Sequence, residues 1–341
     1  MKAAVIERPG VLAVWDIPQP EMGEYDALCE LLYGATCTGT DGHLIHGRFP
    51  WGVSYPTVLG HESVGRVIAV GAQVRHFRVG DIITRVGTVA SPQGDYHVHW
   101  GGFAEYGLAR DHWAMAADGR PAAEWAGSRW NQVVPPDIPP ADATMLTTWR
   151  ETLSYSNRLG IKPGAAVLVV GTGGNGLSFV NHAANLGAER VVVVGSAARQ
   201  DVAQRVGATD FFDYRGDGWP AALKDAFPQG FDFIIDAVGK AGSLDEVLPC
   251  VRPGGVVGIY GIDDYHGYRI NPDRAPGTFT FAKYGYDEAE THQQVIDFIR
   301  LGKLAASNWL DLDAPYPLAR ITDAFAALER RAHVKALVKL T

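Results

Sequence analysis

The stretch that decides the fold is Ala166-Val-Leu-Val-Val-Gly171-Thr-Gly173-Gly-Asn-Gly176. Its apolar half predicts a buried strand, and the glycines turn the chain at once into a helix, which we expect from Gly176 to Leu186. The glycines have the G-x-G-x-x-G spacing, which allows a tight turn, a close approach of the backbone to a pyrophosphate and close packing of helix on strand. The helix N-terminus then offers free N–H groups to phosphates. The stretch therefore predicts a dinucleotide-binding turn, with Thr172, Gly174 and Asn175 beside the three glycines of the motif.

The two parts of the chain differ in their pattern. Residues 1–150 are mostly β-like, with short strands between Gly and Pro turns, and a helical pattern closes this part at about 142–159. From Ala166 onward, strands alternate with helix-length segments, which is typical of a parallel, doubly wound sheet. We expect strands at 2–7, 27–32, 63–70, 166–170, 190–194, 231–236, 255–260, 279–283 and 335–340, and later helices at 288–301 and 321–330.

Composition excludes several classes of protein. The chain has 341 residues, enough for two domains, and a formal charge of −8, which argues against a general nucleic-acid binder. No apolar run approaches the roughly 20 residues of a membrane span. The N-terminus resembles a first strand more than a signal peptide, and three scattered cysteines give no disulfide framework, so we expect a cytoplasmic protein.

Five short motifs, in order along nearly the whole chain, resemble the medium-chain dehydrogenase/reductase family in its zinc-dependent alcohol and polyol dehydrogenase branch. They are Cys37 followed by Gly39-Thr40-Asp41-Gly-His43, Pro56-Thr-Val-Leu-Gly60-His61-Glu62-Ser-Val-Gly65, Val79-Gly80-Asp81, Gly101-Gly102-Phe-Ala-Glu-Tyr and Ile161-Lys-Pro-Gly164. The resemblance implies an α/β protein, with a β-rich GroES-like catalytic domain (1–149 and 284–341) split around a Rossmann domain (150–283). It also implies hydride transfer to or from a nicotinamide cofactor.

The resemblance further implies a catalytic zinc, held by one cysteine of the first motif and by His61. Glu62 lies near the metal as an occasional ligand, and a third ligand comes from the start of the helix before the Rossmann domain. This sequence departs from the pattern twice. Thr38 occupies the usual cysteine position with Cys37 one residue earlier, an offset that a bulge can restore. The third-ligand position falls at Thr147, a poor zinc ligand, and Glu151 lies one helical turn later.

Each metal candidate also has a structural interpretation. Cys37 can be a small buried hydrophobe, His61 a hydrogen-bonded core histidine and Glu151 an exposed helix acid. Many relatives hold a structural zinc with four close cysteines, whereas the corresponding stretch, 86–100, has none. We therefore expect one catalytic zinc and no structural zinc.

The end of the second Rossmann strand indicates which nicotinamide cofactor binds. NAD-binding forms of this fold place a carboxylate there for the ribose 2′-hydroxyl, but this chain has Gly195. Glycine leaves room for a 2′-phosphate, Ser196 can donate a hydrogen bond to it, and Arg199 can pair with it. We therefore expect NADP(H), although Arg199 can equally be a surface helix residue.

Other residues are placed by the resemblance. Thr40 matches the hydroxyl of the family's proton relay and His43 its outer base, while Asp41 supports the loop. Val238 and Gly261 fall on the nicotinamide side of the sheet, and Lys335 is expected near the pyrophosphate. The family's Rossmann edge strand, here 279–283, pairs between subunits, which implies a homodimer or homotetramer.

Three functions remain open at this point. The first is an NADP(H)-dependent zinc dehydrogenase of a secondary alcohol, polyol or ketone. The second is a metal-free carbonyl or ene reductase of the same superfamily. The third is an NADPH-binding protein without turnover, which the Thr40–His43 pair disfavours. Residues expected near the substrate suit either a polyol or an aromatic alcohol: Trp51, His97, Trp100, Trp113 and Tyr265.

Overall fold

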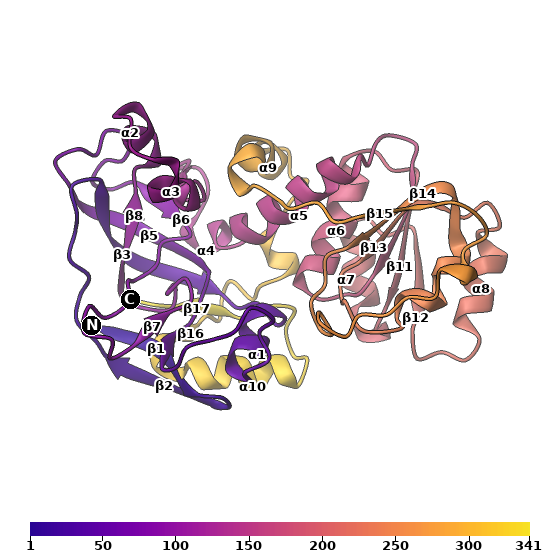
Figure 1. The fold of residues 1–341 in the computed structure, drawn as a ribbon, viewed down its shortest axis with the longest axis horizontal. Coiled ribbons are helices and arrows are strands. Elements are labelled where there is room, and N and C mark those ends of the chain that lie inside the picture. Colours follow the sequence, from indigo (N-terminus) through magenta and orange to yellow (C-terminus); the bar gives the residue numbers. More distant parts are fainter. The chain divides into compact units, whose positions relative to one another are not determined.

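The computed structural model describes residues 1–341 and divides them into two compact units (Figure 1). The first unit comprises Met1–Thr147 and Trp309–Thr341, and the second comprises Thr148–Asn308. The chain therefore leaves the first unit, completes the second and returns. None of the helices is both long and apolar enough to cross a membrane.

The second unit is built on a six-stranded sheet in which every neighbouring pair of strands is parallel. Its spatial order is β12-β11-β10-β13-β14-β15, the doubly wound 3-2-1-4-5-6 order of a Rossmann domain. The expected alternation of strands and helices is therefore confirmed. The strands and longer helices are β10 (Ala166–Val170), α6 (Gly174–Asn185), β11 (Arg190–Gly195), α7 (Gln200–Arg205), β12 (Asp210–Asp213), α8 (Trp219–Ala226), β13 (Phe231–Asp236), β14 (Val251–Ile259), β15 (Thr280–Ala282) and α9 (His292–Arg300).

The glycine-rich turn between β10 and α6 has the backbone that its sequence requires. Gly171 has φ +110°, a conformation that L side chains rarely adopt, and a Cβ on Gly176 would lie 2.2 Å from the Gly171 carbonyl oxygen. Both positions thus exclude any other residue. α6 begins at Gly174, two residues before our expectation, because the turn itself already enters the helix.

The first unit contains two sheets. One has four strands in the order β2-β1-β4-β7, and the other runs β16-β17-β3-β5-β6-β9, with β8 also paired to β3. Their inner faces share one apolar core, which includes Ile6, Leu31 and Phe103. The elements are β1 (Lys2–Arg8), β2 (Val11–Asp16), β3 (Asp26–Ala35), α1 (Thr40–Ile45), β4 (Thr57–Val58), β5 (Glu62–Val70), β6 (Ile82–Thr84), β7 (His97–Val98), β8 (Tyr106–Arg110), α2 (His112–Ala117), α3 (Ala122–Trp125), β9 (Val133–Val134), α4 (Pro140–Ala143), β16 (Tyr316–Pro317), α10 (Ile321–Glu329) and β17 (Leu337–Lys339).

Residues 284–308 cluster with the second unit, whereas we expected them in the first. The reason is a set of polar contacts to helix α5 (Leu146–Leu159). The buried Arg150 guanidinium lies 2.5 Å from a carboxylate oxygen of Glu288, and Arg158 and Ser154 both donate to Glu290. These contacts fasten the segment before α9 to a helix that begins the second unit.

Candidate active site

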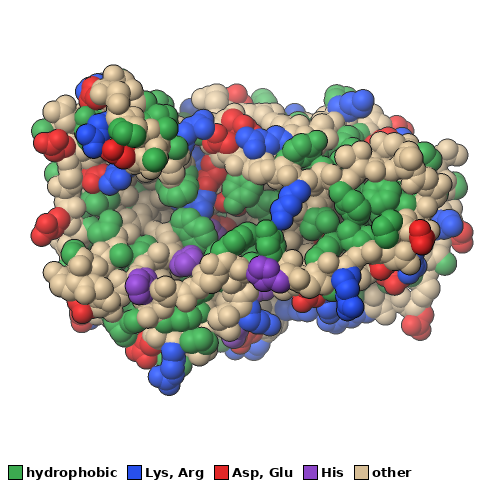
Figure 2. All heavy atoms as spheres, viewed as in Figure 1, with side chains coloured by type: hydrophobic (Ala, Val, Ile, Leu, Met, Phe, Trp, Pro, Cys, Tyr) green, Lys and Arg blue, Asp and Glu red, His purple; other side chains and the backbone are tan.

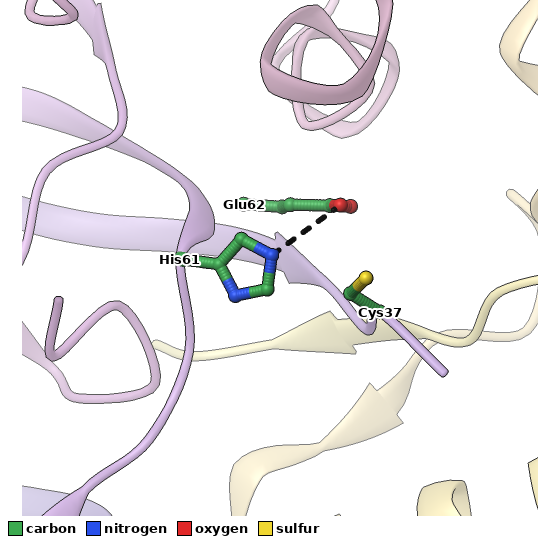
Figure 3. A group of neighbouring side chains, drawn as sticks. All are labelled: Cys37, His61 and Glu62. Atoms are coloured by element: carbon green, nitrogen blue, oxygen red, sulfur yellow. Dashed lines mark ion pairs between the residues drawn. The ribbon is translucent and has the colours of Figure 1, made fainter. Parts of the chain in front are cut away.

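The candidate metal ligands come from two adjacent strands of the first unit. Cys37 follows β3, Glu62 opens β5, and the antiparallel register pairs Ala35 with Glu62. Ligand atoms of Cys37, His61 and Glu62 therefore lie within 4.8 Å of one another, and all three side chains are buried (Figure 3). The backbone before them is constrained, because Gly60 has φ +99° and a Cβ there would lie 2.6 Å from the backbone nitrogen of Phe103.

The structure places Cys37 inside this group despite its offset in sequence. Cys37 is buried, whereas Thr38, at the position where the family has its cysteine, is exposed. β3 also has a one-residue irregularity of register at Leu32, between the pairs Leu31–Gly65 and Tyr33–Val64. A bulge of the kind that re-aims side chains near active sites thus lies upstream of Cys37.

The Asp41 carboxylate contacts both Cys37 and His61. Its Oδ2 accepts the backbone N–H of Cys37 at 2.8 Å, and its Oδ1 lies 3.2 Å from Nδ1 of His61. Burial disfavours the charged form of His61, but Asp41 and Cys37 outweigh it and raise its pKa to about 10. The other ring nitrogen, Nε2, lies 3.7 Å from Oε1 of Glu62 and faces the group. A carboxylate that orients a histidine in this way is the usual outer partner of a metal ligand.

The donor set fits a zinc ion. A thiolate, an imidazole and a carboxylate are the ligands that Zn²⁺ takes in catalytic sites, where three protein ligands leave one position for substrate.

Lys335 also contacts this group, which differs from our expectation of a pyrophosphate contact. Its Nζ lies 2.7 and 2.6 Å from the two carboxylate oxygens of Glu62 and 3.1 Å from the carbonyl oxygen of Thr36. Burial opposes the charge on Lys335, yet Glu62 keeps its pKa above the ordinary value. The ammonium is enclosed among these oxygens, so we assign it to Glu62 instead of the pyrophosphate.

The other residues implied by the resemblance lie on defined elements. Thr40 begins α1 and is partly buried, and His43 lies on the same helix and is buried. Glu151, on α5 in the second unit, is buried and accepts a hydrogen bond of 3.1 Å from the Tyr260 hydroxyl.

The cofactor candidates gather around the glycine-rich turn of the second unit. The backbone N–H of Ser196 donates to the Thr172 hydroxyl at 3.3 Å, and a Cβ on Gly195 would lie 2.1 Å from Cγ2 of Thr172. Val238 packs against Gly171, and Gly261 lies so close to Val238 that a Cβ there would meet its carbonyl carbon at 2.0 Å. Arg199 closes the short helix Ala197–Arg199 directly after β11.

Of the residues expected near the substrate, the structure groups only Trp51 and Trp100. Both contact the Phe49 ring, and Trp100 also contacts His61. Trp113 packs instead on Phe77 and His112, and Tyr265 belongs to the second unit, where it contacts Lys283. His97 is exposed on β7. Phe49, whose ring both tryptophans contact, was not among the residues that we expected near the substrate.

Two family models match the chain. The alcohol dehydrogenase GroES-like domain matches residues 24–119, and the zinc-binding dehydrogenase model matches residues 162–285. These matches and the strand order confirm the expected β-rich domain and Rossmann domain.

Individual proteins show the same likeness. An NADP-dependent isopropanol dehydrogenase of Entamoeba histolytica is 32% identical over 70% of this chain and 67% of its own. A probable zinc-binding alcohol dehydrogenase of Mycobacterium tuberculosis is 30% identical over 79% of this chain and 70% of its own. A solved structure of a putative zinc-binding dehydrogenase from Sinorhizobium meliloti, bound to NADP, is 25% identical, covers 99% of this chain and 98% of its own, and has a TM-score of 0.79.

Proposed function

Because the chain belongs to the zinc-binding medium-chain alcohol dehydrogenase family, we propose that it transfers a hydride between NADP(H) and a secondary alcohol or polyol, or the corresponding ketone. The buried group of Cys37, His61 and Glu62 carries the proposal, because a thiolate, an imidazole and a carboxylate are ligands that zinc takes and their ligand atoms lie within 4.8 Å of one another. When bound there, zinc supplies Lewis acidity toward the substrate oxygen.

The surrounding residues have distinct tasks in this proposal. Asp41 fixes the ring of His61 and the backbone of Cys37, so that both point to one place. Lys335 holds Glu62 by both carboxylate oxygens, so Glu62 serves as an outer or occasional ligand while Cys37 and His61 are steady ones.

A proton must leave the alcohol when the hydride does. Thr40 and His43 lie on one short helix, three residues apart and hence on one face. The Thr40 hydroxyl passes the proton and His43 receives it, because an imidazole nitrogen can accept a proton.

NADP(H) is the proposed cofactor. No carboxylate stands at the end of β11, where it would repel a 2′-phosphate, and Ser196 and Arg199 follow directly. The NADP-dependent isopropanol dehydrogenase of Entamoeba histolytica and the NADP bound in the Sinorhizobium meliloti structure support this choice.

We also propose a homodimer or homotetramer that forms through β15. This strand is the edge of the Rossmann sheet, and Phe281 on it is 43% exposed. Figure 2 shows hydrophobic side chains gathered on the visible face of this unit. Light scattering during gel filtration tests the assembly.

Metal content measured beside turnover tests the function. We expect about one zinc per chain and NADP⁺-dependent alcohol oxidation, with both lost in Cys37→Ser and His61→Gln. Cys250→Ser is the matched control, because Cys250 is also buried but lies in the second unit. Carbonyl or ene reduction by zinc-free protein would instead establish the metal-free reductase, and NADPH binding with no turnover of any alcohol or carbonyl would establish a binding protein.

A further inference from the structure

Four aromatic side chains of the first unit, Phe49, Trp51, His99 and Trp100, form what we call the aromatic cluster. Phe49 is its centre, with ring centroids 5.0 Å from Trp51, 5.3 Å from His99 and 6.2 Å from Trp100, all edge to face. His99 and Trp100 also contact each other at 5.5 Å. The cluster thus forms one continuous aromatic surface.

Trp100 joins this cluster to the candidate metal ligands. Its ring centroid lies 5.2 Å from that of His61. The guanidinium of Arg85 lies 5.5 Å from the centroid of the Trp100 ring and 4.8 Å from that of the Trp130 ring. Arg85 therefore makes a cation–π contact with Trp100, in addition to the contact between Trp100 and His61. An aromatic ring is therefore held directly beside an imidazole proposed to bind zinc.

The backbone that holds Trp100 is strained. Trp100 has φ 62° and its partner Arg85 has φ 54°, and only one other non-glycine residue of the chain has a positive φ. The chain also approaches Trp100 closely, since a Cβ on Gly87 would lie 1.7 Å from its carbonyl oxygen. Strain of this kind persists where the surrounding structure enforces it, most often at active sites and ligand clamps.

The chemistry of the cluster indicates what it contacts. Its surface is mainly aromatic carbon, and burial lowers the pKa of His99, which keeps that ring neutral near pH 7. The Trp51 side chain is 63% exposed, so a ligand that covers its ring would remove apolar surface from water. A linear polyol would need a hydrogen-bonding partner for each buried hydroxyl, which rings of this kind supply poorly.

We propose that the aromatic cluster binds the side group of the substrate and selects alcohols and ketones that carry an aryl ring on the reacting carbon. This inference rests on the proposed function, because it places the carbinol oxygen at the group of Cys37 and His61. The ring of the substrate packs on the aromatic cluster beside Trp100, whose contact with His61 brings the cluster next to the candidate metal ligands.

The test compares kcat/KM for 1-phenylethanol, 2-propanol and D-sorbitol with NADP⁺. Wild-type protein should prefer 1-phenylethanol. Trp51→Ala should lower that value about tenfold, the loss expected for one aromatic contact, and should lower the value for 2-propanol, which has no ring, by a smaller factor. Trp113→Ala is the matched control, because Trp113 lies in the same unit but packs on Phe77 and His112. Equal or better use of 2-propanol or D-sorbitol by wild type, or an equal loss for all substrates in Trp51→Ala, would overturn the inference.

A binding measurement separates this inference from the proposed function. Calorimetric titration of the zinc-loaded protein with benzamide needs no turnover. Saturable binding that weakens in Trp51→Ala but not in Trp113→Ala supports the aryl site even if no alcohol is oxidised. Oxidation of alcohols without benzamide binding keeps the dehydrogenase and removes the aryl site.

Discussion

The ammonium of Lys335 lies 2.6 Å from one carboxylate oxygen of Glu62 and 2.7 Å from the other, and both side chains are buried. They come from the two chain segments that make up the first unit, since Glu62 opens β5 and Lys335 precedes β17. The pair therefore links the C-terminal segment of the chain to the candidate metal site. Because Lys335 contacts both carboxylate oxygens of Glu62, it competes with a metal ion for them.

Breaking this pair should destabilise the protein. Lys335→Met leaves the Glu62 charge buried without its partner, and we expect it to lower the free energy of unfolding by about 3–5 kcal/mol. Glu62→Gln in the same chain should restore part of that loss, because the charge is then removed. Urea titration of EDTA-treated protein measures both.

The control for that experiment is an exposed pair in the same unit. Nζ of Lys2 lies 2.5 Å from Oδ2 of Asp16, but these two side chains are 52% and 73% exposed. Lys2→Met should therefore destabilise the protein far less than Lys335→Met. If Lys335→Met costs as little as Lys2→Met, Lys335 does not hold Glu62 in solution.

Asp41 provides a prediction about metal affinity. Asp41→Asn keeps the shape of the side chain but weakens its hold on His61 and on the Cys37 backbone. We expect zinc to bind about 10- to 100-fold more weakly, the usual effect of losing an outer partner. Competition with a chromophoric chelator measures the affinity. Asp81→Asn, at a turn where Asp81 bonds only local backbone, should bind zinc as wild type does. Equal affinity in both variants would show that Asp41 merely supports the loop.

Much of the fold could be predicted because its signals are local. The strand, glycine turn and helix at 166–185 need only apolar runs and glycines, and four of the parallel strands follow from the same pattern. β12 has no such signal, because Asp210-Phe-Phe-Asp213 has two apolar residues and all four are half-buried. The boundary at residue 308, where the second unit ends, depends on ion pairs between α5 and residues 288–290. These partners are distant in sequence, so no local pattern indicates them.

The site shows the same division. His61 and Glu62 could be found from their motif, and Cys37 from its chemistry despite the offset. The Lys335–Glu62 pair joins residues 273 positions apart, so no local pattern indicates it. The contact of Trp100 with His61 likewise depends on a left-handed backbone at Trp100, which a tryptophan in a sequence does not predict.

The preference for NADPH should depend on Arg199. Hydrogen bonds to charged groups contribute about 1.5–3 kcal/mol, so Arg199→Ala should lower kcat/KM for NADPH about 10- to 100-fold and leave NADH nearly unchanged. Arg190→Ala is the control, since Arg190 is exposed at the other end of β11. A wild-type preference for NADH would end the assignment.

A switch to NADH needs two changes instead of one. Aspartate at Gly195 would clash with Thr172, whose Cγ2 lies 2.1 Å from the position of the added Cβ. Gly195→Asp alone should therefore destabilise the second unit, whereas Gly195→Asp with Thr172→Gly should fold and prefer NADH. Thermal unfolding and the ratio of kcat/KM for the two cofactors distinguish these outcomes. A stable single variant that uses NADH well would contradict the contact between Thr172 and Gly195.

His182 should make the protein less stable in mild acid. It lies fully buried on α6, and burial lowers its pKa to about 3, against 6.5 for the unfolded chain. The folded state therefore binds fewer protons, so stability is complete above pH 6.5 and is lost as the pH falls toward 3. Between pH 7 and pH 5 this one group should cost about 2 kcal/mol. In EDTA-treated protein, the free energy of unfolding of His182→Leu should fall by about 2 kcal/mol less than that of wild type between pH 7 and pH 5. His266→Gln, at an exposed position in the same unit, should show the same pH dependence as wild type. Equal pH dependence in His182→Leu and wild type would mean that His182 accepts a proton inside the folded protein.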